Sequence, residues 1–259
     1  MRGLLFFPLF LTITILLSTP TTPLVVPATG GNSSDNHNQI PSPYTSTLLA
    51  RRLFLLTLHG TLSTTFPASS SPPHLQNHPI GLPDYTASCD PDDKSNPTLL
   101  ALPIATSFRN ALTPGSNISL SLQWVPPPSR KGKEKKSNGE PHPASLPRLS
   151  ILGHLERIPP PHRGVERCFT TAHPDARGWV PGNRIHESVW VRLVVKDVYW
   201  VGGFGDRAWI GWISGEKWRG VTEREIEGVR LPGEEVEGEE EEEGKGWVRW
   251  LSAWIGGEL

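Results

Sequence analysis

Residues 173–218 read HPDARGWVPGNRIHESVWVRLVVKDVYWVGGFGDRAWIGWISGEKW, and this stretch decides the fold. From Val189 to Val201 the odd-numbered side chains are mostly apolar, which predicts a strand with one buried face. Gly202, Gly203 and Gly205 provide the backbone freedom of a turn, and residues 207–213 read as the returning strand. The adjacent charges at Lys196–Asp197 indicate a β-bulge, so the stretch predicts a long bulged hairpin.

Shorter patterns precede the hairpin. A helix is predicted over residues 48–58, capped by Thr45 or Ser46. The segment HGTLSTTF (59–66) alternates an apolar face with a row of hydroxyls, as expected of a strand. Further strands are predicted at 80–89, 96–105, 116–124 and 147–158, with short helices at 106–112 and 162–173. About six strands with short helices suit a mainly β, antiparallel barrel.

Composition favours one compact domain with irregular additions, because 27 Pro and 25 Gly occur among 259 residues. The formal net charge of −1 provides no global basic field, so we expect no nucleic acid partner. A basic run occurs at residues 130–136, within a Pro-rich segment (125–147) that reads as an exposed insertion. No aromatic residue interleaves those lysines, so we expect them to solvate a loop.

Both termini have a composition unlike that of the predicted domain, residues 44–230. The apolar run behind Arg2 is shorter than the ~20 residues of a spanning helix, so residues 1–19 read as a signal peptide, with a membrane anchor as the alternative. We therefore expect no membrane-spanning segment once the signal is removed. The other predicted segments are a disordered leader at 20–43, a disordered acidic tail at 231–246 and a Trp-rich amphipathic helix at 247–255. That helix has three readings: it docks on the barrel, binds a partner or lies at a membrane interface.

A secretory route would allow two sequons to be glycosylated and two cysteines to form a disulfide. Asn32 and Asn117 are predicted N-glycosylation sites, and Asn117 opens the strand pattern of residues 116–124. Cys89 and Cys168 are the only cysteines, and they form either a disulfide or two buried thiols. The expected location is the extracellular space or a vacuolar or other endomembrane lumen.

Few motifs point to chemistry, and no catalytic or metal-binding residue is predicted. Residues 186–190 begin like a zinc protease motif but place Trp190 where the second histidine must stand. Residues 203–208 match GxGxxA, but a strand and not a helix is predicted after them. Thr106–Asn110 follows a strand and opens a short helix, so its hydroxyls and Arg109 form a candidate phosphate site. The alternative is that Thr106 or Ser107 simply caps this helix.

The hairpin, together with GTLSTTF and ATSFRNA, resembles the CREG family of secreted glycoproteins. The resemblance covers about residues 45–228 and implies the FMN-binding split barrel of the pyridoxamine 5′-phosphate oxidase superfamily. Split-barrel flavoproteins hold FMN at a dimer interface. The positions that match their phosphate-binding segments are Thr61, Ser63, Thr106, Ser107, Arg109 and Asn110.

CREG-type proteins lack bound FMN because an insertion fills the groove, so the resemblance implies a binding protein without a cofactor. The segment GGFGDRAW (202–209) is closer to haem-associated split barrels. The predicted function is therefore a secreted or vacuolar, glycosylated homodimer, and the alternative is an FMN-dependent oxidoreductase or a haem-handling protein. Four tryptophans together exceed what a small core readily buries, and this aromatic surplus predicts a homodimer that uses part of the hairpin: Trp190, Trp200, Trp209 and Trp212.

Overall fold

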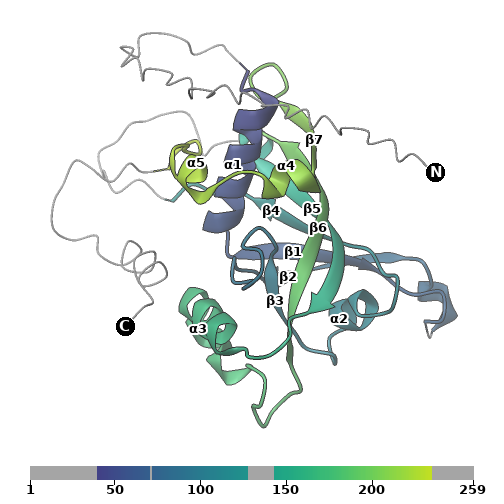
Figure 1. Ribbon diagram of the computed structural model, residues 1–259. Helices are drawn as coiled ribbons and strands as arrows, with labels where there is room; N and C mark the ends of the chain where they lie inside the picture. Colours follow the sequence, from purple (N-terminus) through teal and green to yellow (C-terminus); the bar gives the residue numbers. More distant parts are fainter. Residues whose placement is uncertain (1–39, 71, 128–142, 235–259) are drawn as a thin grey trace, which may run out of the picture. The chain divides into compact units, whose positions relative to one another are not determined.

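The computed structural model describes residues 40–70, 72–127 and 143–234. In chain order the elements are α1 (Pro43–Leu56), β1 (His59–Thr65), η1 (Pro73–Leu75), β2 (Pro79–Tyr85), β3 (Thr98–Ala101), α2 (Thr106–Ala111), β4 (Ile118–Gln123), η2 (Pro143–Ser145), β5 (Arg148–Arg157), α3 (Arg163–Ala172), η3 (Pro174–Gly178), β6 (Val189–Val201), β7 (Ile210–Ser214), α4 (Gly215–Arg219) and α5 (Glu223–Glu227). Figure 1 shows the curled sheet with α1, α4 and α5 near one end and α2 and α3 near the other. The predicted fold class, a mainly β antiparallel barrel with short helices, is confirmed.

The sheet is antiparallel and runs in the order β2-β1-β4-β5-β6-β3, with β7 also pairing with β6. Because β6 is 13 residues long, two strands share the edge that does not face β5. Strand β3 pairs with its beginning and β7 with its end. One bridge, Ala87 with Thr98, joins the chain after β2 to β3 and draws the two ends of the sheet together. Among the described strands, β2 and β3 share no further pairing, which leaves the barrel split there.

The β-bulge is confirmed at the position that the sequence predicted. Leu152 of β5 pairs with Asp197, but Gly153 pairs with Val195. Lys196 is therefore the extra residue of β6, and the register shifts by one at that point.

The bulge also changes which side chains of β6 are buried. Leu193 and Val195 are buried before it, whereas Val198 and Trp200 are buried after it. The expectation that the odd-numbered face stays buried along the whole strand is therefore wrong, and Tyr199 is 37% exposed. One extra residue inverts a two-residue alternation, so the second half of β6 presents the opposite set of side chains to solvent.

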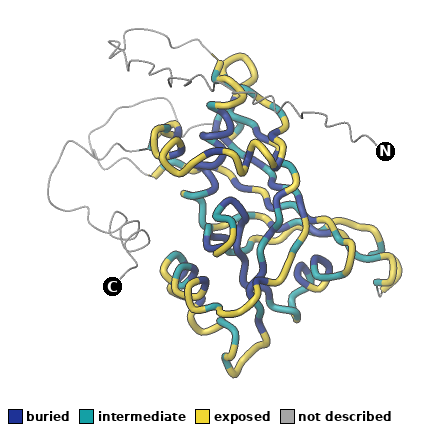
Figure 2. Tube along the Cα trace, in the orientation of Figure 1, coloured by how far each residue is buried: buried dark blue, intermediate teal, exposed yellow. Residues whose placement is uncertain are grey.

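Two apolar clusters cover the two faces of the first half of β6. The main core fills the barrel and includes Phe54 of α1 and Leu193. A second cluster lies on the other face, where Trp190 packs against Phe169 of α3 with ring centroids 5.0 Å apart. The buried stretches in Figure 2 follow these strands and the covering helices, while the loop that joins β1 to β2 is largely exposed.

Helix α1 begins earlier than predicted. Its N-cap is Ser42, whose Oγ accepts a hydrogen bond of 3.0 Å from the Thr45 amide, so the predicted caps Thr45 and Ser46 are wrong. Pro43 occupies the first helical turn, where a missing N–H has no cost. The predicted helix over 162–173 is confirmed as α3.

The folded domain also extends past residue 230, the boundary expected from the acidic composition. Leu231 is buried in the main core, and Trp124 Nε1 donates a 2.7 Å hydrogen bond to the carbonyl oxygen of Pro232. Arg52 forms an ion pair with Glu234. A partly buried ion pair and an apolar anchor thus hold the start of the acidic segment on the domain.

The predicted signal peptide, nearly all of the predicted leader, most of the acidic segment and the Trp-rich helix lie outside the described residues. So does most of the insertion, but its far end belongs to the domain, since the Trp124 amide donates to Pro147 at 2.9 Å. Within the described ranges, no helix has both the length and the apolar character needed to cross a membrane.

Candidate functional site

Two of the six predicted cofactor residues, Thr61 and Ser63, lie on β1, and the other four lie on α2. Thr61 and Ser63 face away from the core, and a Cβ atom added to Gly81 on the neighbouring strand would lie 3.0 Å from Ser63 Oγ. Leu62 and Thr64 point to the opposite, buried face. The hydroxyl row predicted for this strand therefore exists and lies on the outer surface of the sheet.

Helix α2 packs against the buried face of β1. Phe108 is part of the main core, and Ser107 is only 3% exposed. Asn110 Nδ2 donates a buried hydrogen bond of 3.3 Å to Thr64 Oγ1. Strand alternation thus separates α2 from Thr61 and Ser63, which lie on the far side of β1.

Arg109 makes a local contact, because its Nη2 donates to Thr106 Oγ1 at 3.1 Å. The N-cap of α2 is Ala105, whose side chain cannot accept a hydrogen bond, so the alternative that Thr106 or Ser107 caps the helix is wrong. A phosphate site needs donors that converge on one point. Within one protomer the six predicted residues do not converge on one point.

The outer face of the sheet instead carries a continuous transverse row. Register places Thr61 opposite Ser121, Ser121 opposite Ser150, Ser150 opposite Tyr199 and Tyr199 opposite Trp212. The hydroxyls of Ser121 and Ser150 lie 3.3 Å apart, and the rings of Tyr199 and Trp212 have centroids 4.9 Å apart. The exposed face changes from hydroxyls on β1, β4 and β5 to aromatic rings on β6 and β7.

An aromatic pocket of about 530 Å³ lies where β2 and β3 separate; it is referred to below as the split pocket. Its size lies within the range of small-molecule sites. The rings of His59 and Tyr85 have centroids 5.1 Å apart, and those of Tyr85 and Trp179 6.2 Å apart. Its lining residues come from five segments of the chain: His59, Pro83, Asp84, Tyr85, Leu100, Leu102, Trp179 and His186.

Several ionisable groups of the split pocket and its surroundings have shifted pKa values. Burial raises the pKa of Asp84 to about 6, although one carboxylate oxygen accepts a 2.8 Å hydrogen bond from the Tyr85 amide. The Tyr85 hydroxyl donates to Asp175, which raises the pKa of Tyr85 and lowers that of Asp175. His173 packs against Tyr85, donates from Nε2 to the Thr86 carbonyl at 3.0 Å, and has a pKa lowered by burial.

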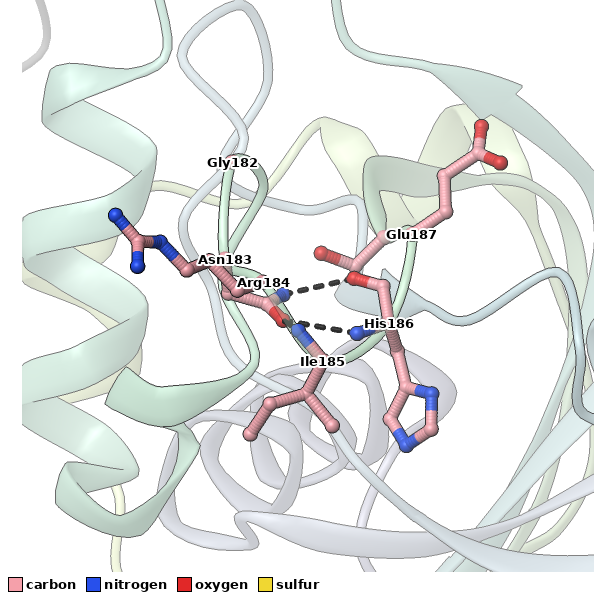
Figure 3. Close-up of a pocket in the computed structure, with 7 residues that line it drawn as sticks. Gly182, Asn183, Arg184, Ile185, His186 and Glu187 are labelled. Atoms are coloured by element: carbon pink, nitrogen blue, oxygen red, sulfur yellow. Dashed lines mark hydrogen bonds between the residues drawn. The ribbon is translucent and has the colours of Figure 1, made fainter.

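A second concavity, of about 370 Å³, is formed by the consecutive residues 182–188 (Figure 3). Asn183 closes this loop, since its Oδ1 accepts from the amides of Ile185 and His186 and its Nδ2 donates to the His186 carbonyl. The polar groups of Asn183 are thus already used within the loop. His186, which in the sequence stands out only as the start of an incomplete zinc motif, borders both pockets.

Residues 203–208 lead into strand β7, so the GxGxxA match has no helix after it. In the described part of the chain, no group of three or more metal-ligating side chains gathers. Cys89 and Cys168 are joined in a disulfide with Cα atoms 5.8 Å apart, and Asn117 is exposed immediately before β4. Asn32 lies outside the described residues.

Solved structures with a similar fold include a heme binding protein from Mycobacterium smegmatis, at 20% identity and a TM-score of 0.49 over 69% of this chain and 60% of that chain. Another is Campylobacter jejuni ChuZ, at 13% identity and a TM-score of 0.47 over 68% of this chain and 62% of that chain. The match spans less than two thirds of either protein. No curated protein sequence matches this chain significantly.

A family model described as CREG, beta-barrel matches residues 41–219, which confirms the resemblance of the hairpin and the strands before it. The chain therefore belongs to the CREG β-barrel family.

Proposed function

We propose that this protein is a secreted or vacuolar, N-glycosylated binding protein that acts as a homodimer and without catalysis. The main support for this location is the disulfide between Cys89 and Cys168, because disulfides persist in oxidising compartments and are rare in the cytosol. Asn117 supports the same route, because its sequon is exposed to a glycosyltransferase at the start of β4.

The separation of the candidate cofactor residues supports binding over catalysis. Thr61 and Ser63 lie on the outer face of β1, whereas Asn110 is held against the buried face. A protomer with this arrangement has no converged phosphate cradle with which to hold FMN. A role that needs only a shaped protein surface is consistent with this geometry.

The outer face of β6 and β7 supports the homodimer. Trp212 is 60% exposed and Tyr199 37% exposed, and Phe204 and Ile210 nearby are exposed as well. Clustered aromatic residues on a sheet face are typical of protein interfaces. Trp190 and Trp200 do not contribute, because both are buried in the core, so that part of the sequence-based expectation is wrong.

Expression of the full chain in a eukaryotic secretory host tests the proposed route. We expect the purified protein to lack Met1, to lose mass on glycosidase treatment and to contain no free thiol. Asn117→Gln should remove one glycan, and Asn32→Gln provides the matched comparison. An intact N-terminus together with no glycan and two free thiols would contradict the proposal.

The alternative to a binding protein without catalysis is an FMN-dependent oxidoreductase or a haem-handling protein. One observation favours it: the hydroxyls of Thr61 and Ser121 lie on the face proposed for the dimer, where a second protomer could complete a site. Titration of the wild type and of Arg109→Ala with FMN, followed by absorbance, separates the two functions. We expect weak binding by both. Tight binding of FMN by the wild type would establish the alternative, and a ten- to a hundredfold weakening by Arg109→Ala, roughly the contribution of a charged hydrogen bond, would place Arg109 in that site. A haem absorbance band in the purified protein would do so for haem.

A further inference from the structure

The split pocket is an opening between strands and not a gap in side-chain packing. If the antiparallel pairing continued from the bridge after β2, Tyr85 would stand opposite Leu100 and Pro83 opposite Leu102. These four residues instead line the cavity. Adjacent strand residues point to opposite faces, so a cavity lined by both Asp84 and Tyr85 wraps around the free edge of β2.

Most of the wall is apolar and aromatic. Of its two leucines, Leu100 is buried and Leu102 is partly buried. Tyr85 and Trp179 form an aromatic surface, of which Trp179 is 36% exposed. The Tyr85 hydroxyl donates to Asp175, which limits the movement of the ring. This rigid surface suits the apolar body of a small ligand.

One carboxylate gives the pocket a chemical preference. Asp84 is partly buried, and its Oδ1 accepts the Tyr85 amide. Within the described residues, Oδ2 has no hydrogen-bond partner and no basic side chain pairs with the carboxylate. Partial removal from water raises the pKa of Asp84 to about 6, which reflects the cost of leaving this charge uncompensated. A cation that enters the pocket removes that cost.

We propose that the split pocket binds a small organic ammonium ion with an apolar or aromatic body. The ammonium group pairs with Asp84, and the body lies on the Tyr85–Trp179 surface above Leu100 and Leu102. An anion is disfavoured by Asp84, and an inorganic divalent ion has only one carboxylate to bind here. An amine with an aromatic ring satisfies both the charge and the apolar wall. The inference goes beyond the proposed function and does not depend on dimerisation or glycosylation.

Calorimetric titration of the full-length, glycosylated protein at pH 7.5 tests this with three probes of nearly equal size. These are 2-phenylethylammonium, neutral 2-phenylethanol and anionic 3-phenylpropanoate. We expect the ammonium to bind about ten- to a hundredfold more tightly than the alcohol, as for a hydrogen bond to a charged group, and the carboxylate not to bind. Equal binding of ammonium and alcohol, or no binding of the ammonium, overturns the proposal. This comparison uses the wild type alone and does not depend on the folding of any variant.

Two variants then locate the site. Asp84→Asn keeps an oxygen for the Tyr85 amide but removes the charge, and should bring ammonium affinity down to that of the alcohol. Asp206→Asn, at an exposed aspartate in the β6–β7 turn, is the matched control and should change nothing. Trp179→Ala should weaken the ammonium and the alcohol alike. Ammonium binding that survives Asp84→Asn in a folded protein places the ligand elsewhere and overturns the proposal.

Binding should also weaken as the pH falls from 7.5 to 5, because Asp84 becomes protonated. Other groups that face the pocket or pack behind its tyrosine also titrate or carry charge: His59, His186, His173 and Asp175. The pH profile of Asp84→Asn isolates the contribution of Asp84 from theirs. A profile that the variant leaves unchanged contradicts the assignment of Asp84.

Discussion

Gly153 lies opposite the bulge of β6, where the backbone of the two strands approaches closely. A Cβ atom at this position would stand 1.9 Å from the carbonyl oxygen of Val194 and 3.1 Å from Leu193 Cδ1. Backbone cannot move aside as a flexible side chain can, so glycine is required here for space. The residue that permits the bulge thus lies on the partner strand and not on β6 itself.

Gly153→Ala should lower the free energy of unfolding by about 2 kcal/mol, a typical cost of overpacking in a well-packed site. Gly164→Ala, in α3, is the matched control, because a Cβ atom there meets nothing within 4 Å. That control should be neutral or stabilising by about 0.5 kcal/mol, since alanine restricts the unfolded chain. Chemical denaturation of both variants measures the difference, and equal effects would show that the clash is relieved by a shift of β5.

Asp84 makes stability depend on pH in a defined direction. Its pKa in the folded state is raised from 3.8 to about 6, so the folded state holds the proton more tightly than the unfolded state. The ionised carboxylate therefore disfavours folding above about pH 6, and this penalty disappears as the pH falls to 3.8 and below.

Asp84→Asn should therefore stabilise the fold at pH 8 by on the order of 1 kcal/mol, a value reduced for water that reaches the partly exposed side chain. The gain should fall toward zero at pH 4. Denaturant unfolding at several pH values measures it, with Asp206→Asn as the control. A gain that is larger at pH 4 than at pH 8 would have the wrong sign for this mechanism.

At the scale of elements, α3 is attached to the sheet in two ways. Phe169 packs its ring against Trp190 of β6, and Cys168, the residue before it, forms a disulfide with Cys89 in the segment between β2 and β3. The aromatic contact fixes the buried face of the helix. The disulfide joins positions 79 residues apart in the sequence, so it removes much of the conformational freedom of the unfolded chain.

Replacement of both cysteines by serine should lower the free energy of unfolding by about 2–5 kcal/mol, the usual effect of losing a native disulfide. Denaturation of the variant beside the wild type measures this loss. Mass spectrometry after thiol alkylation should find no alkylated cysteine in the native wild type and two after reduction. Equal stability of the two proteins would mean that α3 is held by its apolar face alone.

At the scale of the whole molecule, the outer face of the sheet carries exposed aromatic side chains on β6 and β7. The row from Thr61 to Trp212 crosses five strands, and its aromatic end is exposed. Burying Tyr199 and Trp212 against a second copy would remove this apolar area from water. Two protomers could therefore meet across β6 and β7.

Trp212→Lys should convert the dimer to a monomer at micromolar concentration, because a lysine charge would have to be desolvated at the interface. The substitution should leave the fold intact, since Trp212 is 60% exposed. Ile185→Lys, at a residue that is 69% exposed on the 182–188 loop, is the control and should remain dimeric. Light scattering distinguishes the species. A wild type that is monomeric at this concentration would refute the proposed dimer.

How far the sequence predicts the protein depends on the range of the interaction. Alternation along 189–201, the charged pair at Lys196–Asp197 and the glycines after Val201 are local signals, and they correctly predicted a long strand, its bulge and the following turn. The hydroxyl row of β1 was predicted in the same way, because a two-residue repeat is visible in neighbouring residues of the sequence.

Such local repeats do not predict how one element packs against another. The side-chain amide of Asn110 donates to Thr64 and not to Ser63, because α2 packs on the buried face of β1. This packing separates Asn110 from Thr61 and Ser63, although the family resemblance assigns all three to one phosphate site. The split pocket likewise joins His59, Asp84 and Trp179, which become neighbours only through strand order and register. The sequence by itself indicated the strands, their turns and the position of the bulge, since each of these has a signal in adjacent residues. Only the tertiary structure decided which side chains face one another, because that depends on contacts between residues far apart in the chain.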